Sequence, residues 1–272
     1  MGNRKSESGK WAFSAYSEAN SDFRLRTSDL NLGSSKVQNH LTMIFNWLTN
    51  LLGPSSDHPE FWRAYLASLD GALGKRMPIE EVCFVVFDTE TTGLDPKKDR
   101  ILSIGAVKVH NWQIDLSQRL DCYVQQSYQS PGATIEVHGI LPGSNKAQDI
   151  DEIEAVKNFI EYCHNSVLVG HHVAFDIAMV NQVLKGMIGQ KLVNKSLDTA
   201  SLAIRVSEKK DYEQPGTFAL DDLCKKYRIP MSDRHTAAGD AFITAVLLMK
   251  LLARLKKRGV KTLGGLLHGP GL

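Results

Sequence analysis

A continuous apolar run, Val82–Phe87, is followed at once by the string Asp88-Thr89-Glu90-Thr91-Thr92-Gly93. Such a run is typical of a strand that is buried on both faces. Side chains alternate between the faces of a strand, so Asp88 and Glu90 should project together and Thr89 away from them. Paired carboxylates repel each other and do not stabilise a strand. The run therefore predicts a central strand that ends either in a solvated turn or in a pair of oxygen ligands for Mg²⁺ or Mn²⁺.

The residues after this strand carry further strand and helix patterns. Strands are expected at Ile101–His110, Ser117–Gln125 and Ser166–Gly170, with a short strand or a strand-to-helix junction at Lys195–Ala203. Helices are expected at Ile150–Cys163, Phe175–Ile188, Phe218–Tyr227 and Ala237–Lys257. Three strands in succession, followed by alternating strands and helices, predict an α/β fold in which helices flank a mixed sheet.

The first 79 residues show no chemical signal. Residues 1–40 are rich in Ser, Asn and Gly, as in a flexible leader. Apolar residues at helical spacing predict short helices at His40–Leu52 and Pro59–Leu73. We therefore expect residues 1–79 to form a leader and a small helical appendage, which packs on the main domain or on a protein partner. The main domain should span 80–260, and a short tail 261–272.

Composition excludes several classes of protein. The four cysteines lie far apart, which argues against a zinc knuckle or a disulfide scaffold and favours reduced thiols. No apolar stretch is long enough to span a bilayer, and the chain lacks the apolar block of a signal peptide. These features predict a cytoplasmic protein that has no membrane partner.

The net charge of +2 gives no sign of a nucleic-acid partner, but the charge is unevenly distributed. Residues 241–272 hold six Lys and Arg residues and no acid. The basic end Arg254–Lys261 could follow a phosphate backbone. Alternatively, it could complement the dipole at the end of the last helix.

Two later segments place an acid at the start of a helix. Asp176 follows the string Gly170-His171-His172, at a position where an acid also complements the helix dipole. Asp240 is followed by the apolar residues Ala241, Phe242 and Ile243 of the helix start, so it needs a partner or a metal. His235 lies five residues earlier, about 140° away around a helix. It should therefore sit before the helix or at its very start, either as a base that takes a proton from water or as a capping or surface histidine.

Together, these three segments resemble the motifs of the DEDD superfamily of 3′–5′ exonucleases, histidine subtype. That family includes the epsilon proofreading subunit of bacterial DNA polymerase III, RNase T and oligoribonuclease. The resemblance covers residues 80–255 and implies a ribonuclease H-like fold. It also implies that four acids hold two Mg²⁺ or Mn²⁺ ions and that His235 activates the attacking water. The four acids are Asp88, Glu90, Asp176 and Asp240. The tyrosine subtype has Tyr four residues before the last Asp, where this chain has Thr236.

The resemblance further indicates residues near the substrate. Position in the motifs suggests contacts from Thr89, Thr91, Gly93, Leu94, His138 and Phe175. Leu94 or Phe175 could stack on the terminal base or wedge it, although packing would explain both side chains equally well. His138 belongs to Ile135–Ile140, which resembles a V-H-G-I stretch near the substrate in the family. His172 stands where the family commonly has Asn.

The predicted function is therefore metal-dependent hydrolysis of phosphodiester bonds from the 3′ end of DNA, or of RNA, by a two-metal mechanism. The partners would be a single-stranded or frayed 3′ end and the nucleoside monophosphate that is released. One alternative is a catalytically idle nucleic-acid-binding or scaffold domain. Another is a polymerase-associated proofreading subunit in DNA repair. In that role, extra material usually follows the exonuclease domain, whereas here it precedes the domain.

Overall fold

A computed structural model of the 272-residue chain describes residues 58–69, 71, 73–125, 149–207 and 218–268. The chain separates into two compact units, residues 1–67 and 68–272. The described part of the first unit holds most of helix α3 (Glu60–Ser68), which lies within the predicted helix Pro59–Leu73. Its buried Trp62 and Tyr65 rings have centroids 4.8 Å apart. The predicted leader, 1–40, and the predicted helix 40–52 lie outside the described residues.

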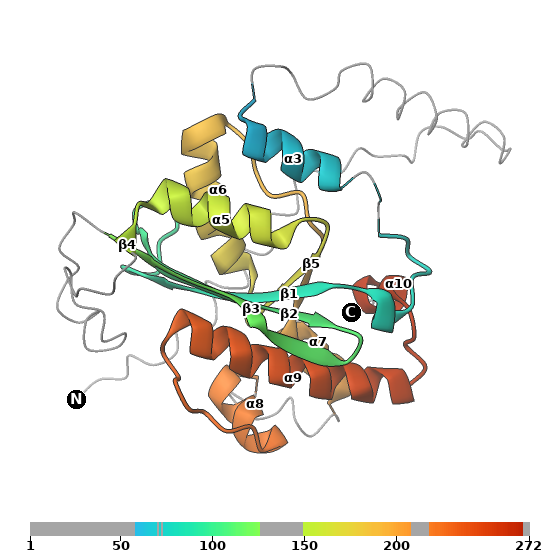
Figure 1. The fold of residues 1–272 in the computed structure, drawn as a ribbon. Helices are drawn as coiled ribbons and strands as arrows, with labels where there is room; N and C mark the ends of the chain where they lie inside the picture. The colour runs from blue at the N-terminus through green and yellow to red at the C-terminus, as the bar shows by residue number, and fades with distance from the viewer. Residues whose placement is uncertain (1–57, 70, 72, 126–148, 208–217, 269–272) are drawn as a thin grey trace, which may run out of the picture. The chain divides into compact units, whose positions relative to one another are not determined.

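The second unit is built on a six-stranded mixed sheet with the order β4-β3-β2-β1-β5-β6 (Figure 1). The strands are β1 (Phe84–Thr91), β2 (Ile101–His110), β3 (Gln113–Val124), β4 (Asp149–Ile150), β5 (Val167–Gly170) and β6 (Ser196–Asp198). Strands β1, β2 and β3 pair antiparallel, whereas β5 runs parallel to β1, β6 to β5 and β4 to β3. The predicted mixed sheet is confirmed.

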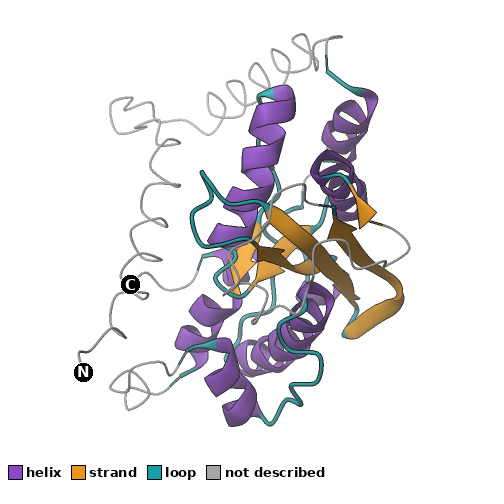
Figure 2. Cartoon of the chain, turned by 90° about the vertical axis from the view of Figure 1, so that its left-hand side faces the viewer, coloured by secondary structure: helices purple, strands orange, loops and turns teal. Residues whose placement is uncertain are grey.

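Helices cover both faces of this sheet (Figures 1 and 2). One face carries α5 (Glu152–Cys163) and α6 (Ala174–Ile188), and the other carries α7 (Thr199–Val206), α8 (Leu220–Tyr227) and α9 (Ala237–Lys257). Two shorter elements are η3 (Ile79–Glu81) and α10 (Leu263–Leu267). No helix in the described part has both the length and the hydrophobicity that a bilayer span requires.

The buried core lies on both sides of β1. Phe84 and Val86 belong to the hydrophobic cluster that includes the apolar face of α9. Phe87 instead packs on Phe159 of α5, with ring centroids 4.6 Å apart. This alternation continues into the acidic string. Its carboxylates therefore fall on the α9 side of the sheet, and its first threonine falls on the side of α5 and α6.

A two-residue turn joins β2 to β3. Asn111 and Trp112 form it with positive φ angles of 47° and 59°. Turns of this hand match the right-handed twist of the paired strands. Strand β3 consequently begins at Gln113, four residues before the start of the predicted strand Ser117–Gln125. The first half of β3 is largely exposed, and only Ile114 and Leu116 in it are apolar, so the alternating pattern there is short.

Segments near the two ends of the second unit pair with each other. The Ile79 N–H donates to the Lys261 carbonyl at 3.1 Å, and the Leu263 N–H donates to the Met77 carbonyl at 2.9 Å. Leu263 and Leu266 of α10 are buried in the core. The paired residues 77–79 and 261–263 thus lie just outside the expected domain 80–260.

Candidate active site

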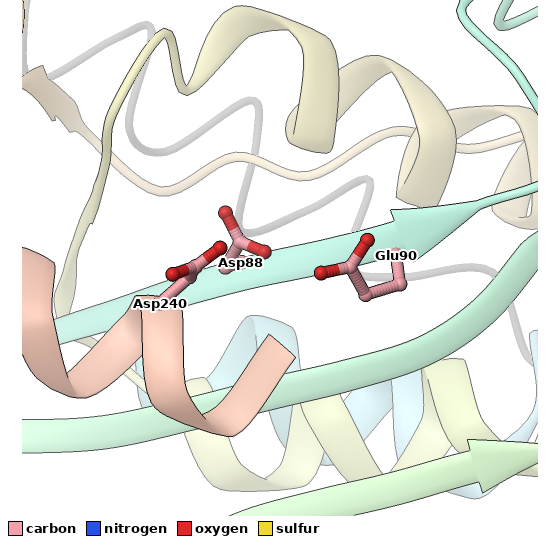
Figure 3. Close-up of side chains that lie close together, drawn as sticks. All are labelled: Asp88, Glu90 and Asp240. Atoms are coloured by element: carbon pink, nitrogen blue, oxygen red, sulfur yellow. The ribbon is translucent and has the colours of Figure 1, made fainter. Parts of the chain in front are cut away.

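Three carboxylates meet at the carboxyl end of β1 (Figure 3). Asp88 and Glu90 extend from β1, and Asp240 comes from the first turn of α9. One ligand oxygen from each lies within 4.8 Å of the others, and no other group in the described part of the chain meets this criterion for a metal site. The structure thus brings together three of the four ligands suggested by the sequence.

Helix α9 reaches this position because Gly105 has no side chain. Gly105 lies opposite Asp88 in the antiparallel pair of β1 and β2. A Cβ atom at Gly105 would overlap the backbone of Ala237 and Ala238, at the start of α9. The close approach of the helix to β2 therefore depends on glycine, and it places Asp240 beside Asp88.

Asp176 approaches β1 from the α6 side. Its Oδ1 accepts hydrogen bonds from the Thr89 backbone N–H at 3.0 Å and from the Thr89 hydroxyl at 2.7 Å. Asp176 is buried in the first turn of α6, yet it is close enough that its charge contributes to the raised pKa of Asp88, after burial. Thr89, expected near the substrate, here fixes the orientation of the fourth acid.

Burial and mutual repulsion make these acids hard to ionise. Burial first, and then the charges of the other three acids, raise the pKa of Asp88. Burial and the charge of Asp240 raise the pKa of Glu90 to about 7. Burial likewise raises the pKa of Asp176 and that of Asp240. A bound divalent cation would remove this repulsion, since hard oxygen ligands suit Mg²⁺ and Mn²⁺.

One atom of the cluster independently fits a bound cation. The Oδ1 of Asp240 is buried and has no hydrogen-bond partner. A buried acceptor without a partner is costly, and ligation of a cation would satisfy it. The donor set and this unsatisfied oxygen together fit a divalent metal.

Arg234 is the part of the site that sequence reasoning missed. Its Nη1 forms an ion pair with Oδ2 of Asp240, and its Nε lies 2.8 Å from Oδ1 of Asp221 in α8. The basic residue next to His235 is visible in the sequence. Its pairing with Asp221 follows only from the fold, which brings the start of α8 to the start of α9.

His235 lies in the segment before α9, as predicted. Thr236 is the N-cap of the helix, and it accepts a hydrogen bond from the Gly239 N–H at 3.1 Å. The His235 side chain is exposed, and its backbone is left-handed, with φ of 67°. Burial raises the pKa of Asp240, whereas Arg234 and then His235 lower it. His235 therefore lies at the edge of the carboxylate site with access to solvent.

The expected substrate contacts differ in exposure. Leu94 is 83% exposed, the highest value among the large apolar residues of the described part. Gly93 and Phe175 are partly exposed, and the buried Thr91 donates its hydroxyl to the Gly93 carbonyl at 2.7 Å. His138 lies outside the described residues. Leu94 is thus the expected contact that is most open to a ligand.

Two histidines follow β5. The Nδ1 of His171 lies 2.9 Å from the Thr199 hydroxyl, and burial lowers the pKa of His171 to about 3. His172 has a left-handed backbone, with φ of 62°, and its N–H donates to Asp198 at 3.3 Å. Their rings meet edge to face with centroids 4.5 Å apart. His171 is therefore a neutral, half-buried group, and His172 is exposed.

The basic end of α9 is largely engaged within the fold. The Arg254 guanidinium lies 4.4 Å from the centroid of the Tyr227 ring. Lys256 pairs with Glu80 at 2.5 Å. Arg258 donates to the carbonyls of Arg205 and Val206, at 2.7 and 2.8 Å, and so caps the end of α7. These contacts favour a structural role for the basic end over a phosphate-binding role.

The sequence is similar to proteins named for DNA polymerase III. The chain is 34% identical over 194 residues to a DNA polymerase III subunit epsilon-like protein of Rhodobacter capsulatus, covering 70% of this chain and 26% of that one. It is 30% identical over 185 residues to DNA polymerase III PolC-type of Bacillus subtilis, covering 67% of this chain and 12% of that one. The chain thus spans about a quarter and about an eighth of these relatives.

The structure is similar to solved structures of exonuclease I. One is E. coli exonuclease I in complex with a dT13 oligonucleotide, with a TM-score of 0.54 and 18% identity, covering 66% of this chain and 43% of that one. Another is apo exonuclease I, with a TM-score of 0.55 and 16% identity, covering 65% and 43%. At this level of identity the likeness establishes the fold, which is the expected ribonuclease H-like fold.

A family model described as Exonuclease (RNase T) matches residues 85–248. The match spans more than half of the chain and includes every acid of the site. The chain therefore belongs to the RNase T exonuclease family, within the DEDD superfamily of 3′–5′ exonucleases.

Proposed function

We propose that this chain is a divalent-metal-dependent 3′–5′ exonuclease of the histidine subtype. It would hydrolyse the terminal phosphodiester bond of a nucleic acid and release a nucleoside monophosphate. The observation that carries the proposal is the convergence of Asp88, Glu90 and Asp240 within 4.8 Å, in a chain of the exonuclease family.

The acids of the site would hold the metal ions. Asp88, Glu90 and Asp240 supply oxygens at the end of β1, and Asp176 completes the set from α6. Thr89 keeps Asp176 turned toward β1 through two hydrogen bonds. When bound, a pair of Mg²⁺ or Mn²⁺ ions supplies positive charge that activates water and offsets the charge developing on the phosphate.

His235 is the residue we assign to proton transfer. Its exposed ring can accept a proton from the attacking water, a role that histidine often has in general base catalysis. Its position before α9 puts it beside Asp240 without making it part of the buried acid cluster. This assignment gives the reaction a base that does not compete with the carboxylates for their role as metal ligands.

We infer that the substrate is a single-stranded or frayed 3′ end of DNA. The exposed Leu94 lies in the loop that follows the acidic string, where an apolar side chain could stack on the terminal base. The polymerase III relatives, and the dT13 oligonucleotide bound to E. coli exonuclease I, support DNA over RNA.

The test uses 5′-labelled oligonucleotides of single-stranded DNA and of RNA with the same sequence. We expect Mg²⁺ to produce a ladder of DNA products that shorten from the 3′ end, with slower loss of RNA. EDTA should stop the reaction. Internal cuts without a ladder, or degradation that persists in EDTA, would contradict the proposal. No degradation with either Mg²⁺ or Mn²⁺ would favour an idle binding domain.

A proofreading role is the second candidate, because both relatives are named as DNA polymerase III proteins. A proofreading enzyme should remove a mismatched 3′ end from a duplex faster than a matched one. Equal rates on the two ends, with a clear preference for single strands, would argue against that role.

A further inference from the structure

We propose that Arg234 is a positioning residue for the metal site. It clamps Asp240 against Asp221 and supplies an internal positive charge to the acid cluster when no metal is bound. The inference rests on the proposed metal-dependent activity and assigns a role to a residue outside the expected set of ligands and base.

The geometry of the clamp uses the shape of the guanidinium group. Its Nη1 pairs with Oδ2 of Asp240, while its Nε lies 2.8 Å from Oδ1 of Asp221. A planar guanidinium can join two carboxylates in fixed directions, whereas a lysine ammonium acts as a single point of charge. One oxygen of Asp240 is thereby fixed, and the other, Oδ1, is left without a hydrogen bond.

The ion pair between Arg234 and Asp240 is partly buried, unlike an ion pair on the protein surface. The Asp240 side chain is 6% exposed, and that of Arg234 is 23% exposed. Asp221, by contrast, is 49% exposed. A partly desolvated ion pair is screened less than an exposed one, and removing one partner leaves the other charge uncompensated. Loss of Arg234 should therefore disturb Asp240 more than it disturbs Asp221.

The backbone around Arg234 is tightly constrained. Asp233 and His235, on either side, are left-handed, with φ of 60° and 67°. The Thr236 hydroxyl donates to the Asp233 carbonyl at 2.7 Å, and a Cβ atom at Gly239 would overlap that carbonyl. The segment is thus held against the first turn of α9. Anchoring Arg234 also fixes the backbone from which the His235 side chain extends.

Charge and geometry can be separated with matched variants. Arg234→Gln removes both the positive charge and the planar guanidinium that contacts two carboxylates. Arg234→Lys keeps only the positive charge. Asp221→Asn weakens the anchor of the guanidinium on α8. Asp222→Asn is the control, because this neighbouring acid of α8 pairs with Lys225 at 3.6 Å. Each variant is compared by its melting temperature with EDTA and with Mn²⁺, and by kcat and KM on single-stranded DNA.

We expect Arg234→Gln to melt lower than wild type in EDTA and to gain more from Mn²⁺, because its acid cluster lacks the internal cation. Arg234→Lys should show the wild-type Mn²⁺ shift. Both variants should lower kcat by about tenfold to a hundredfold with little change in KM, since small misplacements of catalytic groups are costly. Asp221→Asn should lower kcat less, and Asp222→Asn should match wild type.

Other outcomes would overturn the inference. A higher KM with unchanged kcat would make Arg234 a phosphate contact. An Mn²⁺ shift in Arg234→Gln equal to that of wild type would refute the role as internal cation. If wild type has no nuclease activity, the proposed function fails, but the Mn²⁺ shifts still test the charge role of Arg234.

Discussion

Asp240 is a buried acid whose two oxygens have different surroundings. Oδ2 pairs with Arg234, whereas Oδ1 is buried and has no hydrogen-bond partner. An unsatisfied buried polar group costs about 1–3 kcal/mol. That cost persists in the metal-free protein and would be relieved by a bound cation. At the scale of single residues, the site is thus a strained acid cluster that is suited to metal binding.

The variant His235→Asn tests whether His235 acts as the general base and not as a metal ligand. General base catalysis contributes about 10²–10⁴-fold to a rate, so we expect kcat to fall by about that factor. The rise in melting temperature with Mg²⁺ should remain, because His235 is not among the clustered carboxylates. His110→Asn, at the exposed end of β2, is the control. A His235→Asn enzyme with normal kcat, or one that no longer responds to Mg²⁺, would contradict the assignment.

At the scale of elements, regular segments were predictable and close approaches were not. The bounds of β2 and α9 agree with the predicted Ile101–His110 and Ala237–Lys257, because both segments carry long apolar patterns with clear ends. The contact between β2 and α9 depends on Gly105. A side chain at this position is excluded only because the backbone of α9 packs against it. The sequence shows a glycine inside the strand pattern, but it does not show which helix packs against that glycine.

The acids of the site were predictable for a different reason. Their spacing along β1 and at two helix starts is a local pattern that resembles a known family. The ion pairs of Arg234 with Asp221 and Asp240, and the hydrogen bonds of Thr89 with Asp176, are tertiary contacts between different elements. Such contacts depend on how α6, α8 and α9 pack around the sheet, which no local pattern specifies.

Gly105→Ala tests the packing of α9 on β2. The added methyl would overlap the α9 backbone, and overpacking of this kind costs about 1–3 kcal/mol. We expect a lower free energy of unfolding in urea and a lower exonuclease rate, because Asp240 moves with the helix. Gly186→Ala in α6 is the matched control. Its Cβ meets no atom within 4 Å, so it should stabilise the protein by about 0.5–1 kcal/mol. Equal stability of Gly105→Ala and wild type would contradict this account of the contact.

At the scale of the whole molecule, charge is nearly balanced but locally concentrated. The net charge is +2, yet four acids gather around the end of β1, and several basic residues of α9 are engaged at its far end. Net charge is therefore a poor guide to a nucleic-acid enzyme that meets phosphate through bound cations. The field at the site, rather than the total charge, determines how the protein responds to pH and to metal.

The stabilisation by Mg²⁺ should depend on pH. The raised pKa values of Asp88 and Glu90, the latter at about 7, mean that the metal-free acids hold protons at low pH. Mg²⁺ must displace these protons, so binding strengthens as pH rises through that range. We expect the Mg²⁺-induced rise in melting temperature to grow from about pH 5 to about pH 8. Taking the difference with and without Mg²⁺ removes the pH dependence of groups far from the site, and a constant difference would contradict the account.

The most direct test of the central claim is the release of mononucleotides from a 3′-labelled DNA strand by wild type and by Asp88→Asn, in Mg²⁺. Asp115→Asn is the control, because this acid of β3 bonds to Ser117 rather than to the site. Asp88→Asn should fold normally, since it removes a charge that its neighbours repel. The account predicts release by wild type and Asp115→Asn and only background release by Asp88→Asn. Release by Asp88→Asn at the wild-type rate would contradict it.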